Sequence, residues 1–501
     1  MNEVRTLAKQ TLIYGFGTIV PRFLNYGILT FFYTRIFDKA QYGIVTELYA
    51  WMVFLLIVLT YGMETGFFRF AQKKEDYEKI YSTSILSLLV TSALFIILVN
   101  IFIRPVSAAL NYSNHHDYIR MFAFIVAIDA FTAIPFARLR KENKALLFSI
   151  IKIMNVAITI ATVLFLLLWA PSIYENSRGW FRKIYDPDYG VGYVFLANLI
   201  GSTSTLVMLL PFVVRIRPIF DNLIWKKMIN YSFPLMIAGL SGAINDTLDK
   251  VIMRRVVGEK TGLETVGEYG AGYKIAVLMA LFIQMFRYAA EPFFFERAIH
   301  ENAKEAYAFV MKYFVIAMLV IYLCINLYIS GFQLIIGKAF RDSIIVVPIV
   351  SMGYLFYGIY LNHSIWYKLN DLTKYGILIT LTGAVITILI NVLLIPVYGY
   401  MASAWAHVAS YGSMIIMSFI LAEKYYRIEY KMKELVPYFV IVIGIVIFSR
   451  VFHYKNLSSE LVINSGFLII FLWFAQYKDQ LFTVFIRKKR NENQNSKQIQ
   501  A

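Results

Sequence analysis

Long apolar runs, separated by short polar connections, fill almost the whole chain. The runs cover approximately residues 10–34, 41–67, 80–103, 118–138, 144–170, 189–214, 228–253, 264–291, 306–330, 342–366, 373–396, 399–423, 434–452 and 459–477. Most of them reach the roughly 20 residues that a transmembrane helix needs, and they lack the short alternating segments of a membrane β-barrel. The pattern therefore predicts an all-α polytopic membrane protein with about 14 transmembrane helices.

The composition agrees with this prediction. Of the 501 residues, 59% are hydrophobic and 16% are charged, whereas a soluble protein is about half apolar and a quarter charged. The net charge of +17 would indicate nucleic-acid binding in a soluble protein. In a membrane protein the Lys and Arg residues belong in the cytoplasmic loops, so no nucleic-acid partner is expected. The single cysteine, Cys324, excludes a disulfide within the chain and a thiolate metal site.

The distribution of Lys and Arg predicts the topology. With the N-terminus inside, about 29 of these residues lie on the cytoplasmic side and about 14 on the opposite side. We therefore expect both termini in the cytoplasm and a multi-pass protein of the cytoplasmic membrane. Residues 481–501 are predicted to be a basic cytoplasmic tail.

Weakly repeated motifs divide the chain into halves. The motif Gln41-Tyr42-Gly43 has a counterpart in Glu268-Tyr269-Gly270, and Tyr189-Gly190 has one in Tyr398-Gly399. The offsets of a little over 200 residues predict a six-helix lobe over 1–217, a second over 218–426 and an extra helix pair, the thirteenth and fourteenth, over 427–480. Membrane proteins with two such halves are typically secondary transporters, with the substrate site between the halves near the midplane.

The first helix of each predicted half contains breaks. Pro21 interrupts the first apolar run, and Pro234, Gly239 and Gly242 interrupt the seventh. Proline frees a carbonyl group and bends a helix, so we expect these four residues to act as hinges. The alternative is that Gly and Pro are simply common in membrane helices.

Charged residues within the spans are the candidate site residues, because a charge at the bilayer centre costs at least about 2.5–3.5 kcal/mol. The predicted substrate-binding cations are Arg22, Lys250, Lys274 and Arg287, and the predicted coupling or charge-balancing acids are Asp129, Asp246, Asp249 and Glu291. The cations suit a phosphate or an acidic sugar. The acids suit H⁺ or Na⁺, or they balance the cations. The alternative is that these groups are structural ion pairs or snorkelling side chains.

Two spacings predict ion pairs on single helices. Asp246, Asp249 and Lys250 are placed at i, i+3 and i+4, and Arg287 and Glu291 at i and i+4. The lone histidines His363 and His407 lie in apolar spans and are predicted to be packed or hydrogen-bonded. The chain has no nucleotide-binding, zinc-protease or serine-hydrolase motif, so we expect neither an enzyme nor a bound cofactor.

Several motifs resemble those of one family. Tyr33-Thr34-Arg35-Ile36-Phe37 and the stretch Tyr61 to Phe70 are similar to the start of bacterial polysaccharide transporters, Leu248-Asp249-Lys250 to their second half, and Ile395-Pro396-Val397-Tyr398-Gly399 to the entry of their twelfth helix. In their order and spacing, the chain resembles the O-antigen and capsule flippases of the multidrug/oligosaccharidyl-lipid/polysaccharide exporter superfamily. The resemblance implies two six-helix lobes in a V shape. The similar lipid II flippases use arginines in their first helices, which implies a substrate-binding role for Arg22.

The resemblance implies a flippase that translocates undecaprenyl-diphosphate-linked oligosaccharide, a unit of O-antigen, capsule or related polysaccharide, by alternating access. The implied partners are the lipid-linked oligosaccharide, membrane lipid and polysaccharide assembly proteins, and a monomer is expected. H⁺ and Na⁺ both stay open as coupling ions. The alternatives are a drug/cation antiporter of the same superfamily and a membrane polysaccharide polymerase or ligase. A polymerase or ligase would need a larger external loop than this chain offers.

Overall fold

The predicted all-α class is confirmed. The computed structural model describes residues 17, 19–72, 76–176, 179–214, 216–298, 300–370, 372–452 and 456–480. Within these residues every regular element is a helix, and no strand is present. A helix satisfies all of its backbone hydrogen bonds within one segment, which is the condition for crossing a bilayer. The predicted tail, residues 481–501, lies outside the described residues.

Eleven helices in the described part of the chain are long and apolar enough to cross a membrane. They are Lys39–Phe70, Tyr77–Ile101, His116–Lys141, Ala145–Asn176, Gly192–Val214, Ala303–Leu327, Lys338–Leu369, Thr373–Tyr398, Tyr400–Tyr425, Met432–Val451 and Leu457–Asp479. A pair bent by 42°, Thr261–Ala276 with Leu278–Arg297, adds a twelfth if it is counted as one span. The multi-pass prediction is thus confirmed, and the count of fourteen stays a prediction.

The two remaining predicted segments explain the difference in number. The first, 10–34, lies partly outside the described residues. The seventh, 228–253, is contained in a single 36-residue helix, α12 (Asn222–Val257). Polar residues in the second half of α12, among them Asp246 and Asp249, lower the mean hydropathy of this helix.

The first half of the chain begins with an irregular helix. A π-helical turn, η1 (Asn25–Leu29), leads into α2 (Thr30–Ile36). The remaining elements of this half are α3 (Lys39–Thr60), α4 (Met63–Phe70), α5 (Tyr77–Ile101), α6 (Ile103–Ala109), α7 (His116–Lys141), α8 (Ala145–Leu164), η2 (Phe165–Trp169), α9 (Ala170–Asn176), α10 (Phe181–Ile184), η3 (Pro187–Tyr189) and α11 (Gly192–Val214). The Asp38 side chain starts α3 by accepting a hydrogen bond from the Gln41 amide.

The second half follows from α12. Its elements are α13 (Glu259–Ala276), α14 (Leu278–Arg297), α15 (Ala303–Leu327), α16 (Ile329–Phe332), η4 (Gln333–Ile335), η5 (Lys338–Val346), α17 (Val347–His363), α18 (Ile365–Leu369), α19 (Thr373–Tyr398), α20 (Tyr400–Tyr425), α21 (Met432–Val451) and α22 (Leu457–Asp479). Gly190 and Gly399 precede α11 and α20 with similar backbone angles, φ 52° and ψ −113° against φ 57° and ψ −147°. The repeated Tyr-Gly motifs therefore begin two helices in the same way.

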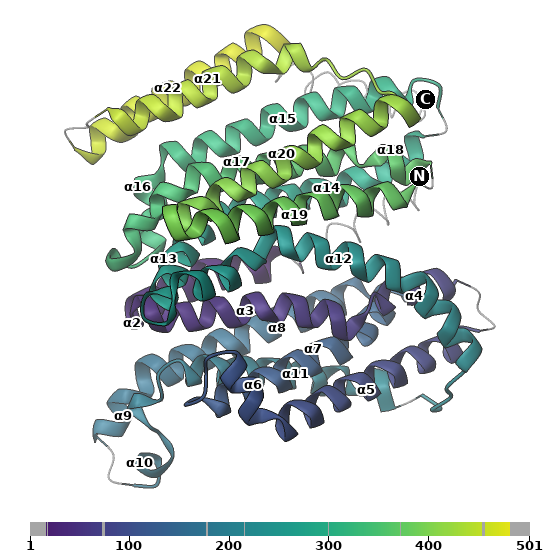
Figure 1. Ribbon diagram of the computed structural model, residues 1–501, viewed down its shortest axis with the longest axis vertical. Helices are drawn as coiled ribbons and strands as arrows, with labels where there is room; N and C mark the ends of the chain where they lie inside the picture. The colour runs from purple at the N-terminus through teal and green to yellow at the C-terminus, as the bar shows by residue number, and fades with distance from the viewer. Residues whose placement is uncertain are drawn as a thin grey trace, which may run out of the picture.

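The helices form two groups with three helices between them (Figure 1). One group contains α5, α7, α8 and α11, and the other contains α15, α17, α19 and α20. Helices α3, α12 and α13 lie between the groups and pack on one another. The exact limits of the two lobes, at 217 and 426, stay a prediction.

Helix α12 contacts both groups along its length. Near its start, the Trp225 indole donates a hydrogen bond of 2.8 Å to the Ser87 hydroxyl on α5. Near its end, the Asn245 amide oxygen accepts one of 3.2 Å from Thr387 on α19. At 1.5 Å per residue, 36 residues span about 54 Å, so one continuous helix connects the two groups.

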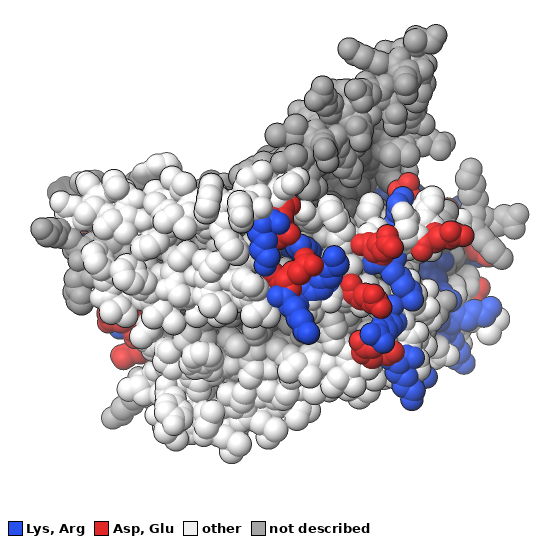
Figure 2. Space-filling view, turned by 90° about the horizontal axis from the view of Figure 1, so that it is seen from above, with Lys and Arg blue, Asp and Glu red and all other residues white. Residues whose placement is uncertain are grey.

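The pair α21 and α22 is fastened to α15 at one end. The Lys312 ammonium contacts Glu434 at 2.5 Å and also pairs with Asp479, which accepts a hydrogen bond of 2.5 Å from Tyr438. On the face seen in Figure 2, Lys, Arg, Asp and Glu gather toward one end and leave a broad uncharged surface beside them. This separation is typical of a lipid-facing surface next to a headgroup region.

Candidate functional site

A cavity of about 350 Å³ lies between the two helix groups. Residues of η1, α2 and α3 form one wall, and residues of α12, α13, α14 and α17 form the other. Four predicted site residues meet in it: Arg22, Asp246, Lys250 and Lys274. The structure thus brings together charges from three separate predicted spans.

Arg22 enters the cavity from the irregular first helix. It directly follows Pro21 and precedes the π-helical turn η1. Its Nη1 atom donates a hydrogen bond of 2.6 Å to the side-chain oxygen of Gln284 on α14. Arg22 therefore reaches the opposite wall, and its guanidinium keeps further donors for an anionic ligand.

The two lysines of the cavity lie against aromatic rings. Lys274 Nζ is 4.4 Å from the centre of the Tyr26 ring, and Lys250 Nζ is 3.6 Å from that of Tyr273. The carboxylate of Asp246 accepts hydrogen bonds of 2.8 Å from the hydroxyls of Tyr273 and Tyr354. Among the described residues that line this cavity, Arg22, Lys250 and Lys274 are cations and Asp246 is a carboxylate. Lys250 is also paired with Asp249, and the remaining positive charge suits an anionic group.

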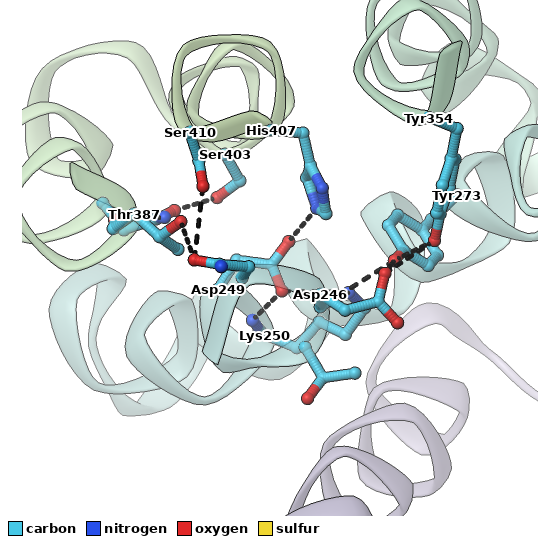
Figure 3. Close-up of polar contacts among 12 residues, drawn as sticks. Asp246, Asp249, Lys250, Tyr273, Tyr354, Thr387, Ser403, His407 and Ser410 are labelled. Carbon is cyan, nitrogen blue, oxygen red and sulfur yellow. Dashed lines mark hydrogen bonds and ion pairs between the residues drawn. The ribbon is translucent and has the colours of Figure 1, made fainter. Parts of the chain in front are cut away.

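Asp249 faces the interior of the second helix group instead. Its Oδ1 atom is 2.9 Å from Lys250 Nζ, and its Oδ2 atom is 3.4 Å from His407 Nε2 on α20. Asp249, Lys250 and His407 are only 2%, 5% and 2% exposed. Figure 3 shows Asp249 directed toward His407, and Asp246 directed away toward Tyr273 and Tyr354.

Neutral polar groups surround the buried pair of Asp249 and His407. Thr387 and Ser410 each donate a hydrogen bond of 3.2 Å to the Asn245 side-chain oxygen. Ser403 donates one of 2.6 Å to the Asn391 side-chain oxygen (Figure 3). A polar layer therefore joins α12, α19 and α20 in an otherwise apolar lobe, and it stabilises the packing of these three helices.

The other predicted acids and cations do not join the cavity. Asp129 lies in the first group, where it accepts a hydrogen bond of 2.7 Å from Ser202. Arg287 and Glu291 line a separate cavity of about 20 Å³. Glu291 pairs with Lys368 at 2.9 Å, a different partner from the predicted Arg287.

The predicted hinges behave differently in the two halves. A π-helical turn follows Pro21 closely, so the first helix is irregular there. Helix α12 continues as one α-helix through Pro234, Gly239 and Gly242. A methyl group at Gly242 would meet nothing within 4 Å, so packing does not require glycine there. The hinge role of these residues stays a prediction.

Two features escaped the sequence reasoning. His407 was predicted to be packed or hydrogen-bonded in an apolar span, and its partner, the Asp249 carboxylate at 3.4 Å, was not predicted. Six tyrosines also line the cavity: Tyr26, Tyr33, Tyr42 and Tyr49 on the wall of η1, α2 and α3, and Tyr273 and Tyr354 on the opposite wall. The sequence spacing could have indicated this wall, because Tyr26 and Tyr33 are seven residues apart, as are Tyr42 and Tyr49. That spacing places both rings of a pair on one helix face.

One end of the cavity is closed by contacts between the two halves. In Figure 1 this end carries α9, α10 and α16, and we call it the outer end because the charge distribution predicts it to be external. Lys39 pairs with Glu268 at 2.8 Å, and the buried Arg254 lies 3.3 Å from Glu47. Glu47 also accepts a hydrogen bond of 2.6 Å from Tyr112.

Glycines bring the backbones of α3 and α13 into direct contact at the same end. A Cβ atom at Gly267 would lie 1.9 Å from the Lys39 carbonyl oxygen, and one at Gly43 would lie 2.0 Å from that of Leu263. No side chain fits at such distances. The repeated motifs around Gly43 and Gly270 thus face each other across the closed outer end.

The sequence of residues 7–297 matches the family model described as polysaccharide biosynthesis protein. The chain belongs to this family. The predicted resemblance to polysaccharide transporters is confirmed. A comparison with curated protein sequences gave no match.

Solved structures share the fold. The lipid II flippase MurJ, in an inward closed conformation, superposes with a TM-score of 0.71 at 14% identity, over 93% of this chain and 99% of that one. An outward-facing transporter of the multidrug resistance MATE family of the MOP superfamily gives a TM-score of 0.60 at 15% identity, over 84% of this chain and 94% of that one. Its inward-facing form gives 0.58 at 14% identity, with coverages of 83% and 95%. This chain thus shares the fold of these solved transporters.

Proposed function

We propose that this protein flips a lipid-linked oligosaccharide across the cytoplasmic membrane, with undecaprenyl diphosphate as the lipid carrier. The observation that carries the proposal is the cavity between the halves, where the described lining residues include Arg22, Lys250 and Lys274 beside the carboxylate of Asp246. A diphosphate matches this charge, and planar guanidinium suits phosphate oxygens. Family membership supports a role in polysaccharide biosynthesis.

A protein is needed because the sugar and the diphosphate cannot cross hydrocarbon unaided. Each unsatisfied polar group would cost several kcal/mol in the bilayer core. The polar cavity replaces water around the headgroup, while the polyprenyl chain stays in lipid. No covalent step is required, so the proposed activity is transport rather than catalysis.

The closed outer end supports alternating access. The ion pairs Lys39–Glu268 and Glu47–Arg254, together with the glycine contact, join the halves at that end. Export requires these contacts to break and the opposite end to close. A direct test replaces Lys39 and Glu268 with cysteine in a Cys324→Ala background. Cross-linking with a short bifunctional thiol reagent should stop export, and transport that continues at full rate would contradict alternating access.

The buried Asp249 and His407 support ion coupling, and we favour the proton. Lys250 lies 2.9 Å from one Asp249 oxygen, and the other oxygen faces a histidine, a side chain that binds protons. Proton uptake by His407 would place a charged imidazolium 3.4 Å from the other oxygen and complete the pair. Proteoliposomes with a pH gradient or a Na⁺ gradient separate the two ions, because only the coupled ion should drive flipping.

The proposal places both termini in the cytoplasm of a monomer in the cytoplasmic membrane. Polysaccharide assembly proteins would receive the flipped unit on the outer side. Labelling of single cysteines at exposed Lys304 and at Asp188 with a membrane-impermeant reagent tests the orientation. On intact cells only the cysteine at 188 should react.

The function is tested by measuring the lipid-linked oligosaccharide on each side of the membrane in spheroplasts. Loss of the protein should cause this lipid to accumulate in the inner leaflet, and Arg22→Gln should reproduce much of the effect. Arg120→Gln, an exposed arginine of α7 outside the cavity, is the matched control. Loss of glycan export without this accumulation would contradict flipping.

The fold shared with a multidrug MATE transporter favours one second candidate, a drug/cation antiporter. The cavity argues against it, since three cations and one carboxylate would repel a cationic drug. Efflux of a cationic dye that depends on this protein would support the antiporter.

A further inference from the structure

The two walls of the central cavity differ in chemistry. The wall formed by η1, α2 and α3 contains the four tyrosines Tyr26, Tyr33, Tyr42 and Tyr49. The opposite wall carries Asp246, Lys250 and Lys274, with two further tyrosines, Tyr273 and Tyr354, whose hydroxyls bond Asp246. Apart from Arg22, the cavity charges thus lie on one side and most of its aromatic surface on the other.

Three of the four tyrosines border the cavity without packing into the closed outer end. Tyr26 and Tyr49 are half-buried beside the cavity. The Tyr33 side chain is 5% exposed, and its hydroxyl is buried with no hydrogen-bond partner. A buried hydroxyl without a partner is costly, so a ligand that bonds Tyr33 would remove a penalty. Tyr42 differs, because its ring packs edge-on against Phe340 at 5.5 Å as part of the closed outer end.

We propose that Tyr26, Tyr33 and Tyr49 form a sugar-binding wall that receives the carbohydrate next to the diphosphate. This inference rests on the proposed function. A pyranose has flat C–H faces and a rim of hydroxyls, and a tyrosine offers a flat apolar ring with a hydroxyl at its edge. The ring spacing of seven residues on each helix gives two short aromatic stripes along the same wall.

The proposal assigns the headgroup an orientation. The diphosphate lies toward Lys250 and Lys274, and the first sugar lies toward α2 and α3. Lys274 marks the boundary, because its ammonium sits 4.4 Å from the Tyr26 ring centre. Recognition of the sugar and of the diphosphate then depends on different residues and can be separated by mutation.

The test measures binding of two probes to the purified full-length protein in detergent. One probe is the lipid-linked oligosaccharide extracted from the cells, and the other is bare polyprenyl diphosphate. Tyr26→Leu and Tyr49→Leu should weaken binding of the first probe about tenfold and leave the second within twofold. Tyr33→Phe removes only the hydroxyl and should cost about two- to tenfold. Lys274→Gln should weaken both probes.

The controls separate a folding defect from a lost contact. Tyr328→Phe removes a hydroxyl that bonds Ser465, between α15 and α22 and away from the cavity, and should leave both affinities unchanged. Retained binding of bare polyprenyl diphosphate shows that a tyrosine variant is folded. Equal losses for both probes in the tyrosine variants would overturn the sugar-binding wall. A wild-type protein that binds neither probe would overturn the proposed function itself.

Discussion

Asp246 and Asp249 lie three residues apart on α12, yet they occupy different environments. Asp246 borders the cavity and accepts hydrogen bonds from Tyr273 and Tyr354. Asp249 is buried inside the second helix group with Lys250 and His407. Three residues of an α-helix turn by 300°, so the two carboxylates diverge by about 60°. That angle separates the surface that we propose to meet the substrate from the surface that we propose to meet the coupling ion.

One side chain, Lys250, connects the environments of Asp246 and Asp249. Lys250 belongs to both environments, because it lines the cavity and pairs with Asp249. Its ammonium also donates to the Asp246 backbone carbonyl at 3.2 Å. Under the proposed function, a change in the charge of Asp249 or His407 would alter how firmly Lys250 is held, and hence how it contacts a diphosphate. The physical link is one side chain on a rigid helix.

The largest effect is expected from Asp249→Asn. It leaves the Lys250 ammonium buried without its carboxylate, which costs about 3–5 kcal/mol. We expect flipping to fall at least about 100-fold, the factor that about 2.7 kcal/mol represents, together with a clear drop in the thermal unfolding temperature. Flipping in proteoliposomes and unfolding by differential scanning fluorimetry measure the two quantities.

A double variant separates the loss of stability from the loss of flipping. Asp249→Asn with Lys250→Met removes both charges of the buried pair, and such replacements are often neutral for stability. The unfolding temperature should recover while flipping stays lost. If flipping also recovers, the pair is only structural and the two faces of α12 do not differ in function. Asp188→Asn, at an exposed position far from α12 in sequence, should change neither quantity.

Lys274→Gln tests the cavity side alone. The substitution removes one of the three cavity cations without touching Asp249 or His407. We expect affinity for bare polyprenyl diphosphate to fall about tenfold, because a hydrogen bond to a charged group contributes about 1.5–3 kcal/mol. The dependence of flipping on the pH gradient should keep its shape. A changed pH dependence would show that the two environments cannot be separated.

Asp246→Asn should act in the opposite direction. Removal of the cavity carboxylate raises the positive charge around the ligand, so bare polyprenyl diphosphate should bind about fivefold tighter, which corresponds to about 1 kcal/mol. Flipping should slow, because the headgroup leaves less readily. Isothermal titration and the flipping assay report the two changes, and weaker binding would contradict the assignment of Asp246 to the substrate side.

The membrane class and several members of the site were predictable from sequence, and the reason is physical. Apolar runs of span length leave few alternatives to helices, and intramembrane charges such as Arg22 and Lys274 must face a polar region. These two features require no knowledge of how the helices pack. They are properties of each segment and the bilayer.

The partners of each charge were not predictable, since they depend on tertiary packing. The spacing of Asp246, Asp249 and Lys250 indicated one shared helix face, but neighbouring helices divide that face between a cavity and a buried layer. His407 lies far along the chain from Asp249, and local spacing cannot bring them together. Likewise, Glu291 pairs with Lys368 of another helix rather than with Arg287 one turn away.

The smallest effect is expected from Thr387→Val, which tests how far the polar layer around Asp249 and His407 extends into α19. Thr387→Val on α19 removes the hydroxyl that donates to Asn245, one residue in the polar layer near Asp249. Ser410 still donates to the same oxygen, so we expect a stability loss of only about 1 kcal/mol and a two- to threefold change in flipping. Thr382→Val is the matched control, because this half-buried α19 hydroxyl donates to the Leu378 carbonyl and to Met417 Sδ, away from Asn245 and Asp249. Equal effects of both valines would limit the ion-coupling region to Asp249, Lys250 and His407. A larger effect of Thr387→Val alone would extend that region to the contact between α12 and α19. In the proposed alternating-access cycle, this contact stays formed while the outer end opens.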